Sequence, residues 1–411
     1  MDEKNNITLL LQVRKQRGQE IAKTQKVSYN NGKWLVPSQS SNRQYEVVLG
    51  LGNSRCNCPD YQERGLKCKH IFAVEVSITK EIDTEGNITI TKRITYAQNW
   101  KAYDTAQTNE KRLFLKFLSD LCEDIEEPPY KFGRPRLPLK DMVFASALKI
   151  YTTFSLRRFM TDFDIALKEG YISKQCSYRS VGGYLQDENL TPILQNLIML
   201  SALPLRSVET KFAVDSTGFR TTKFNEYCKE KHNTKKEHQW VKVHICTGVK
   251  TNIITGVEIT GENVNDSPLF IPLVNHTASL GFNMEEVSAD KAYNSINNYN
   301  AVQEIGGQAY IPFKSNATGK SDHTKGNRAR LWRKMFRYFT YNRDEFLGHY
   351  HLRSNIESTN NMIKAKFTDL VRSKDPVAQT NEVLLKVLCH NIVVLIHEMY
   401  ELGIEPNFLG A

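Results

Sequence analysis

One group of side chains in the sequence has the composition of a metal-binding cluster. Three cysteines and a histidine occur in the order Cys-x-Cys-x9-Cys-x-His, as Cys56, Cys58, Cys68 and His70. Three thiolates and one imidazole form a complete tetrahedral ligand set for Zn²⁺, and a closed set of this kind is structural rather than catalytic. A redox pair is the competing interpretation, but the spacing is not Cys-x-x-Cys and a histidine ligand favours metal. We therefore expect one structural zinc ion.

A second group consists of acidic residues that are distant from one another in the sequence. Asp215 and Asp290 each end a predicted strand, and Glu357 lies in a helical C-terminal segment. Divalent ions such as Mg²⁺ prefer oxygen ligands. Two such ions held about 4 Å apart stabilise the attacking and the leaving oxygen during phosphoryl transfer. The three acids are candidates for such a site only if the fold brings them together, because an isolated aspartate at a strand end is usually a turn former.

The elements predicted from residue 206 onward allow these acids to meet. Three β-rich runs, at 211–219, 240–248 and 253–260, predict an antiparallel meander. A helix, a strand, a helix, a strand and a long helical tail follow, at 267–281, 285–293, 295–306, 308–313 and beyond. This order resembles the RNase H-like fold, which has a mixed five-stranded sheet flanked by helices. The resemblance implies that the first and fourth strands are neighbours and that a tail helix packs across them.

The helical tail carries a polar pattern around the third acid. Tyr350, Arg353, Glu357 and Lys364 are separated by three, four and seven residues, so all four project from one face of a helix. A solvated face with an Arg–Glu pair four residues apart would give the same offsets. The pattern Tyr-x2-Arg-x3-Glu-x6-Lys, however, resembles the signature of a large group of bacterial and archaeal insertion-sequence transposases of the DDE type.

The sequence resembles these transposases over about residues 206–400. VDSTGF and ADKAYNS, which contain the two aspartates, are similar to the family segments of the first and second acids, and Asn265-Asp266-Ser267 is similar to its NDS turn. The resemblance implies that Asp215, Asp290 and Glu357 are catalytic and hold two Mg²⁺ or Mn²⁺ ions in each active site. It further implies that Tyr350, Arg353 and Lys364 contact the DNA backbone near the scissile phosphate.

Four further residues are predicted to support the site or DNA. Lys242 and His244 alternate to the same face of the second strand and are similar to a Lys-x-His pattern of related transposases. Lys291 and Tyr293 follow the second acid, where a cation could meet phosphate and a ring could stack on a displaced base. A structural histidine and ordinary packing of the tyrosine are the alternatives. The segment between the second and third acids is too short for the large β-insertion of some relatives, so hairpin chemistry that depends on it is not expected.

Four domains are predicted along the chain. They are a β-rich domain at 1–95, a helix and basic linker at 96–138, a helical DNA-binding domain at 139–205 and an RNase H-like catalytic domain at 206–405. The cysteine and histidine cluster resembles a SWIM zinc finger over about residues 40–80, which implies binding of DNA or of a protein. Arg134 and Arg136 lie in a GRPR segment of the linker that could enter a narrow minor groove, although plain linker is the alternative.

The composition agrees with a polyanionic partner. Lys and Arg outnumber Asp and Glu by 55 to 45, which gives a formal charge of +10. The N-terminus has no secretory pattern, and no run approaches the roughly 20 apolar residues of a membrane span. We therefore expect a cytoplasmic protein that is not associated with membranes, and the resemblance to insertion-sequence transposases implies a prokaryotic host and association with the nucleoid.

These expectations combine into one function with two rivals. The expected protein is a DNA transposase that binds terminal inverted repeats and, as the family resemblance implies, acts as a homodimer on double-stranded DNA, cutting these ends and joining them to target DNA. A nuclease or resolvase on the same fold would cut without joining. A domesticated regulator would bind DNA through its zinc module without chemistry.

Overall fold

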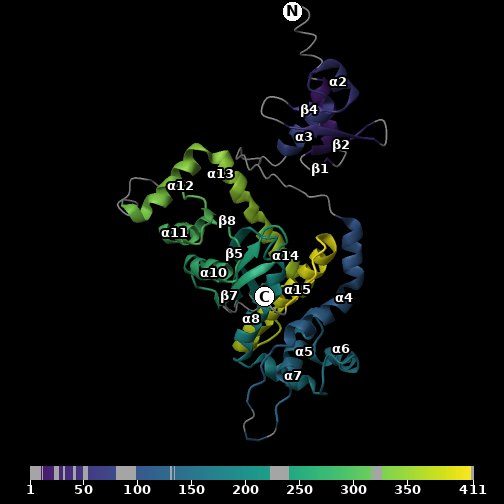
Figure 1. Cartoon of the computed structure of the whole chain (residues 1–411), viewed down its shortest axis with the longest axis vertical. Helices are drawn as coiled ribbons and strands as arrows, with labels where there is room; N and C mark the ends of the chain where they lie inside the picture. The colour runs from purple at the N-terminus through teal and green to yellow at the C-terminus, as the bar shows by residue number, and fades with distance from the viewer. Residues whose placement is uncertain are drawn as a thin grey trace, which may run out of the picture. The chain divides into compact units, whose positions relative to one another are not determined.

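The computed structural model describes residues 11, 13–22, 27–30, 33–39, 43–49, 54–79, 99–129, 132–133, 135–222, 240–315, 317 and 326–408. The chain divides into two compact units, Met1–Trp100 and Lys101–Ala411. Figure 1 shows the elements of each unit along the chain. Residues 80–95, the end of the predicted β-rich domain, lie outside the described residues.

The N-terminal unit is built on a small antiparallel sheet with the order β1-β2-β3-β4. Its strands are Ser28–Asn30, Lys33–Pro37, Gln44–Val48 and Arg55–Cys56, and two helices follow, α2 (Pro59–Arg64) and α3 (Lys69–Thr79). The apolar side chains of Val36, Val47, Ile71 and Val74 are buried between sheet and helix. The described part of this unit is mixed rather than β-rich, because α2, α3 and the helical residues 13–22 accompany the four strands.

The second unit begins with helices. The helix predicted within 96–138 is α4 (Trp100–Cys122). Four shorter helices follow in the region 139–205 that was predicted to be helical: α5 (Leu139–Tyr151), α6 (Leu156–Lys168), α7 (Tyr178–Leu185) and α8 (Leu190–Ala202). Each buries apolar residues at helical spacing. A short 3-10 turn, η1 (Leu203–Leu205), leads into the sheet.

A mixed five-stranded sheet forms the centre of this unit. Its strands are β5 (Lys211–Arg220), β6 (Trp240–Gly248), β7 (Ile254–Gly261), β8 (Glu286–Ala289) and β9 (Gln308–Tyr310). The spatial order is β7-β6-β5-β8-β9, with antiparallel pairing of β5 to β6 and of β6 to β7, and parallel pairing of β8 to β5 and of β9 to β8. The first and fourth strands are therefore neighbours, as predicted.

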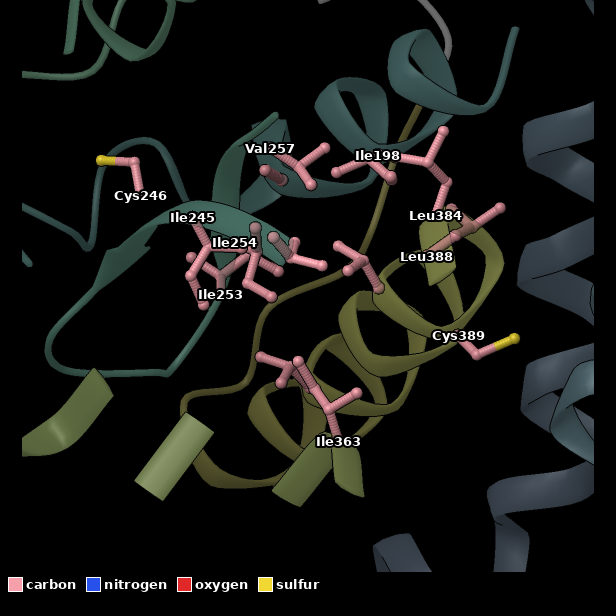
Figure 2. Packing of buried hydrophobic residues seen from close by; sticks show 14 of the residues in the cluster. Ile198, Ile245, Cys246, Ile253, Ile254, Val257, Ile363, Leu384, Leu388 and Cys389 are labelled. Carbon is pink, nitrogen blue, oxygen red and sulfur yellow. The ribbon is translucent and has the colours of Figure 1, made fainter. Parts of the chain in front are cut away.

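Helices cover the sheet. The helix α10 (Ser267–Ser279) lies against β6 and β7, and α11 (Ile296–Glu304) precedes β9. Gly256 on β7 approaches Leu273 of α10 closely enough that a Cβ would touch it at 3.3 Å. The next residue, Val257, points to the opposite face because strand side chains alternate, and there it packs with Ile198 of α8 (Figure 2).

The long helical tail that we predicted is not one continuous helix but a series of shorter ones. It consists of η4 (Asn327–Ala329), α12 (Arg330–Tyr341), α13 (Arg343–Tyr350), the 3-10 turn η5 (His351–Arg353), α14 (Ser354–Phe367) and α15 (Pro376–Glu401). Thr368 ends α14 with a φ of 64°, in the left-handed region, which turns the chain away from the helix axis.

One helix of the described residues, α15, is long and apolar enough to cross a membrane by length and composition, contrary to our expectation of no such run. Within this fold 78% of its apolar window is buried. Leu384 and Leu388 pack with Ile198 of α8 and Ile254 of β7 (Figure 2). The buried Asn391 side chain accepts a hydrogen bond from the Ile254 amide at 3.0 Å and donates one to the Ile254 carbonyl at 2.8 Å. The helix α15 is therefore a core helix, which packs against both α8 and the sheet.

Candidate functional site

Two of the predicted acids lie side by side where two parallel strands separate. The parallel pairing of β5 with β8 ends at the partners Val214 and Ala289, which are both completely buried. Asp215 and Asp290 are the next residues on their strands. We predicted that Asp215 would end its strand, and this prediction was wrong. The strand β5 continues to Arg220 through its pairing with β6. The end of the β8 pairing, rather than a strand end, places the two carboxylates at one edge.

The third acid reaches this edge from α14. Glu357 lies in the first turn of that helix, and Ile356 and Ile363 anchor the helix through buried side chains. Arg353 connects the acids, because its Nη1 donates to Asp215 Oδ2 at 3.0 Å and its Nη2 donates to Glu357 Oε1 at 2.9 Å. The structure therefore brings all three predicted acids to one end of the sheet.

The electrostatics agree with this clustering. Burial raises the pKa of the Asp215 carboxyl, Arg353 opposes that rise, and the charges of Asp290 and Glu357 add to it. Burial also raises the pKa of Tyr350, against the effect of Arg353 and with a further contribution from Asp290. Carboxylates that repel one another at a partly buried site favour a cation among them. In this structure the guanidinium of Arg353 supplies that charge.

The three carboxylates fit hard divalent ions, but their oxygen atoms are not close enough to one another to surround a single ion. Three carboxylates offer the oxygen ligands that Mg²⁺ and Mn²⁺ prefer. Among the described residues, only the cysteine and histidine cluster has at least three ligand atoms that all lie within 4.8 Å of one another. Arg353 lies between two of the acids instead. Binding of metal would therefore require the guanidinium to give up at least part of its contact with the carboxylates.

The four residues of the predicted helical pattern lie on three different elements. Tyr350 ends α13, Arg353 belongs to η5, and Glu357 and Lys364 belong to α14. Lys364 Nζ donates to Thr217 Oγ1 at 2.6 Å, and Thr217 shares a face of β5 with Asp215 because the two positions differ by two. Burial lowers the pKa of the Lys364 ammonium. The pattern thus lies along β5 even though it is not one continuous α-helix.

An acid without a predicted role organises the second strand. Asp266 receives an ion pair from Lys242 at 2.5 Å and lies 3.6 Å from His244 Nδ1. The His244 side chain has no exposed surface, and its Nε2 lies 2.9 Å from Thr260 Oγ1. Burial lowers the pKa of His244, which favours the neutral ring. This placement favours the structural alternative for His244, and the NDS turn that contains Asp266 was the sequence signal for the acid.

The residues after the second acid differ in exposure. Lys291 is exposed, and its backbone amide donates to Asp290 Oδ1 at 2.7 Å. Tyr293 is 1% exposed and its ring packs against Phe270. Burial raises the pKa of its phenol, and so do the nearby charges of Asp266 and Asp215. The structure thus favours ordinary packing for Tyr293, which was one of our two interpretations. The side chain of Lys291, in contrast, is exposed to solvent.

The predicted zinc ligands form one compact group in the N-terminal unit. Cys56 ends β4, Cys58 caps α2, Cys68 directly precedes α3, and His70 lies in its first turn. The four ligand atoms lie within 4.8 Å of one another, and all four residues are buried. His70 Nδ1 is the nitrogen that faces the thiols, at 3.9 Å from both Cys56 Sγ and Cys68 Sγ.

Local backbone conformation creates this arrangement. The antiparallel pairing of Val47 with Cys56 holds the first ligand at the end of a hairpin. Gly65, with a φ of 62°, ends α2 in the left-handed conformation and returns the chain toward the second pair of ligands. Three buried thiols cannot ionise together without a cation, and the donor set and its size fit Zn²⁺.

Comparison with known proteins identifies both regions. Residues 206–392 match the family model of the Transposase DDE domain, and residues 45–78 match that of the SWIM zinc finger. The chain carries a transposase DDE domain and a SWIM zinc finger. A search of curated proteins gives no match.

A solved structure with some similarity is the piggyBac transposase synaptic complex with hairpin DNA, determined by cryo-EM. The identity is 12%, the TM-score is 0.34, and the match covers 75% of this chain and 77% of that one. The DDE domain match itself contains Asp215, Asp290 and Glu357 together with Tyr350, Arg353 and Lys364. The helices α4 to α8 precede the matched region.

The linker arginines lie outside the DDE domain. Arg136 is exposed, whereas Arg134 lies outside the described residues. Between β9 and α14 the described residues of the domain are helical or irregular and include no strand. Where it is described, that segment consists of irregular residues after β9 followed by η4, α12, α13 and η5.

Proposed function

We propose that this protein is a DNA transposase that cleaves and joins DNA strands with Asp215, Asp290 and Glu357. The observation that carries the proposal is the position of the two aspartates, which directly follow the last paired residues of two buried parallel strands. Glu357 reaches Asp215 through the shared Arg353. The strand order and pairing are those of an RNase H-like domain, which is the fold we assign to residues 206–405.

In this proposal the three carboxylates hold two Mg²⁺ or Mn²⁺ ions, which supply activation of a water or a 3′-hydroxyl and stabilise the leaving oxygen when bound. The residues of the chain position the substrate. Tyr350, Arg353 and Lys364 contact phosphates beside the scissile bond, and the exposed Lys291 contributes a further cation. Lys242 acts indirectly, since it forms an ion pair with Asp266, and His244 supports that pair by packing beside it.

The remaining regions are assigned to recognition. The SWIM finger within residues 1–95 holds one structural Zn²⁺, and the helices at 139–205 together with the linker at 96–138 bind terminal inverted repeats. Arg134 and Arg136 of the linker enter a minor groove. Strand joining requires two ends to be held together, so we assign a homodimer on double-stranded DNA. The protein acts at the nucleoid in the cytoplasm of a prokaryotic host.

The test uses the full-length protein with zinc bound. Its substrate is duplex DNA that carries the inverted repeats flanking the gene. Asp215→Asn and Glu357→Gln should each lower Mg²⁺-dependent cleavage by at least a hundredfold while leaving binding to the repeats intact. Glu304→Gln removes an exposed acid of the same domain and should leave cleavage unchanged. Unchanged cleavage in Glu357→Gln would overturn the proposal.

Two rival functions give different products in the same assay. A nuclease or resolvase on this fold would release cut ends but form no covalent joint with a target plasmid. A regulator without chemistry would bind the repeats and cut nothing. The three acids and the associated Tyr350, Arg353 and Lys364 are all present, which argues against a regulator without chemistry, and the strand-transfer product separates the transposase from a nuclease.

A further inference from the structure

A strongly basic surface lies apart from the acids, on α12. The helix has two distinct faces. Trp332 and Met335 are buried, and the ring of Phe313 packs against Trp332, Phe336 and Phe339 at centroid distances of 5.0 to 5.4 Å. This apolar face fixes the helix in position. The opposite face therefore projects away from the core in a fixed orientation.

The opposite face is cationic. Arg330, Lys334 and Arg337 recur at offsets of four and seven residues, so they share that face, and all three are exposed. None of these three forms an ion pair with a carboxylate of the described residues. Ordinary protein surfaces intersperse both signs of charge, so an unneutralised row of this kind is unusual.

A groove extends from this face toward α11 and has a volume of about 790 Å³. We call it the α12 groove. Its lining includes the three exposed cations, further cations and polar side chains, and no carboxylate: Asn300, Gln303, Asn327, Arg328, Arg330, Leu331, Arg333, Lys334 and Arg337. Arg328 is held at its wall, because Nη2 donates to Asn297 Oδ1 at 2.7 Å and its carbonyl accepts from Asn300 at 3.0 Å. Charge complementarity requires a polyanionic occupant.

The spacing of the cations suits a nucleic-acid backbone. Arg330 and Arg337 are separated by about 10 Å along the helix, from a rise of about 1.5 Å per residue. Phosphates of one strand of duplex DNA recur about every 3.4 Å along the axis, so this span faces about three of them. Arginine also provides a planar donor fork that matches phosphate.

The groove is mechanically connected to the acidic site. Trp332 Nε1 donates to Asn294 Oδ1 at 2.9 Å, and Asn294 lies four residues after Asp290. The amide of Asn294 in turn donates to the carbonyls of Ile311 and Pro312 at 3.2 and 3.0 Å. The segment that follows the second acid therefore holds the start of α12. A strand that lies in the groove is fixed relative to Asp290.

We propose that the α12 groove binds the sugar–phosphate backbone of duplex DNA without reading its sequence. This contact is additional to those of Tyr350, Arg353 and Lys364. The inference rests on the proposed function only in taking DNA as the ligand. Because the α12 groove is connected to the segment that follows Asp290, DNA bound in the groove would have a fixed direction beyond the scissile phosphate.

The experiment measures binding without catalysis. Full-length protein with zinc bound is titrated onto a labelled duplex of arbitrary sequence, with magnesium omitted, at salt concentrations from about 50 to about 200 mM. The test variant carries Arg330→Gln, Lys334→Gln and Arg337→Gln. The control carries Arg206→Gln, Lys250→Gln and Lys374→Gln, which removes the same charge from exposed positions of the second unit that lie outside the α12 groove and outside residues 96–205.

The expected result is a weaker salt dependence in the test variant. The slope of log K against log salt concentration should fall in magnitude by about 2 to 3, at about 0.9 for each phosphate that the variant no longer neutralises, and affinity should fall at least tenfold. The control should keep the slope of the unsubstituted protein. A variant with Arg330→Lys and Arg337→Lys should retain binding, and equal thermal midpoints will show that each variant is folded.

Three outcomes would overturn the inference. Equal effects of the two triple variants would mean that net charge alone matters, and no effect of either would mean that the groove does not touch DNA. Stronger binding of polyglutamate than of duplex DNA, abolished only in the test variant, would assign the groove to an acidic protein. Each outcome is separate from the cleavage test of Glu357→Gln, because no metal is present and no bond is cut.

Discussion

Arg353 offers a direct test of how the acidic site is balanced when no metal is bound. The substitution Arg353→Gln removes the guanidinium that contacts Asp215 at 3.0 Å and Glu357 at 2.9 Å. It leaves three acids without a counter-charge at the edge of the sheet. We expect the variant to be less stable than the unsubstituted protein in the absence of divalent ions, and to recover most of this loss when they are added.

The two contacts contribute unequally. The side chains of Arg353 and Asp215 are 18% and 21% exposed, so their hydrogen bond is a charge-assisted contact at a largely buried site, worth about 1.5 to 3 kcal/mol. Glu357 is 60% exposed, and an exposed pair contributes only about 0.2 to 1 kcal/mol. The expected loss is therefore about 2 to 4 kcal/mol, nearly all of it from Asp215.

The assay is scanning calorimetry of the full-length protein with and without millimolar MnCl2. A loss of this size lowers the midpoint of a large domain by several degrees, at about 2 to 4 °C for each kcal/mol. Mn²⁺ should raise the midpoint of the variant more than that of the unsubstituted protein. Arg220→Gln is the control, since Arg220 pairs with Asp369 at 2.7 Å away from the triad. Equal Mn²⁺ shifts in the unsubstituted protein and in Arg353→Gln would refute this account of the site.

Two further predictions concern groups away from the acids. Cys58→Ser should lower the zinc content, measured by mass spectrometry, from one ion per chain to none and unfold the N-terminal unit, whereas Cys176→Ser should leave the content unchanged. Burial lowers the pKa of His390 from 6.5 to about 4, so the unfolded state takes up its proton first and the free energy of unfolding should fall as the pH drops from about 6.5 toward 4. Urea titrations at about pH 7.5 and 4.5 measure how much unfolding free energy each protein loses between these pH values. This loss should be about 2 kcal/mol smaller in His390→Gln than in the unsubstituted protein, and an equal loss in both would contradict the assignment.

Much of the catalytic unit could be predicted because its local signals agree. Each strand of the sheet is bounded by turn residues, and the helices at 139–205 carry apolar residues at helical spacing, so both sets formed where expected. The cysteine and histidine cluster was predictable because a ligand set is defined by residue type and spacing. Asp215 and Asp290 could be placed together once the first and fourth strands were expected to pair.

Other features depend on contacts that no local pattern contains. The helical tail breaks at η5 and again at Thr368, where tertiary packing overrides a periodic sequence. The apolar residues of α15 give it the length and mean hydropathy of a membrane span, and only its packing in the fold shows it to be a core helix. Asn391 hydrogen bonds to Ile254, which lies far away in the sequence. Asp266 was visible as a turn motif, but its ion pair with Lys242 requires the register of the sheet.

The acids differ in how firmly the fold holds them, and this difference locates the adjustable part of the site. Asp215 and Asp290 directly follow the fully buried Val214 and Ala289, so their backbones are fixed by paired strands within a packed core. Glu357 lies on the first turn of α14, is 60% exposed and is linked to the strands through Arg353. A change that exchanges the guanidinium for metal therefore costs least at η5 and the first turn of α14. Under the proposed function, the two aspartates would set the position of the reacting phosphate, and the Arg353–Glu357 segment would take up the adjustment that metal binding requires.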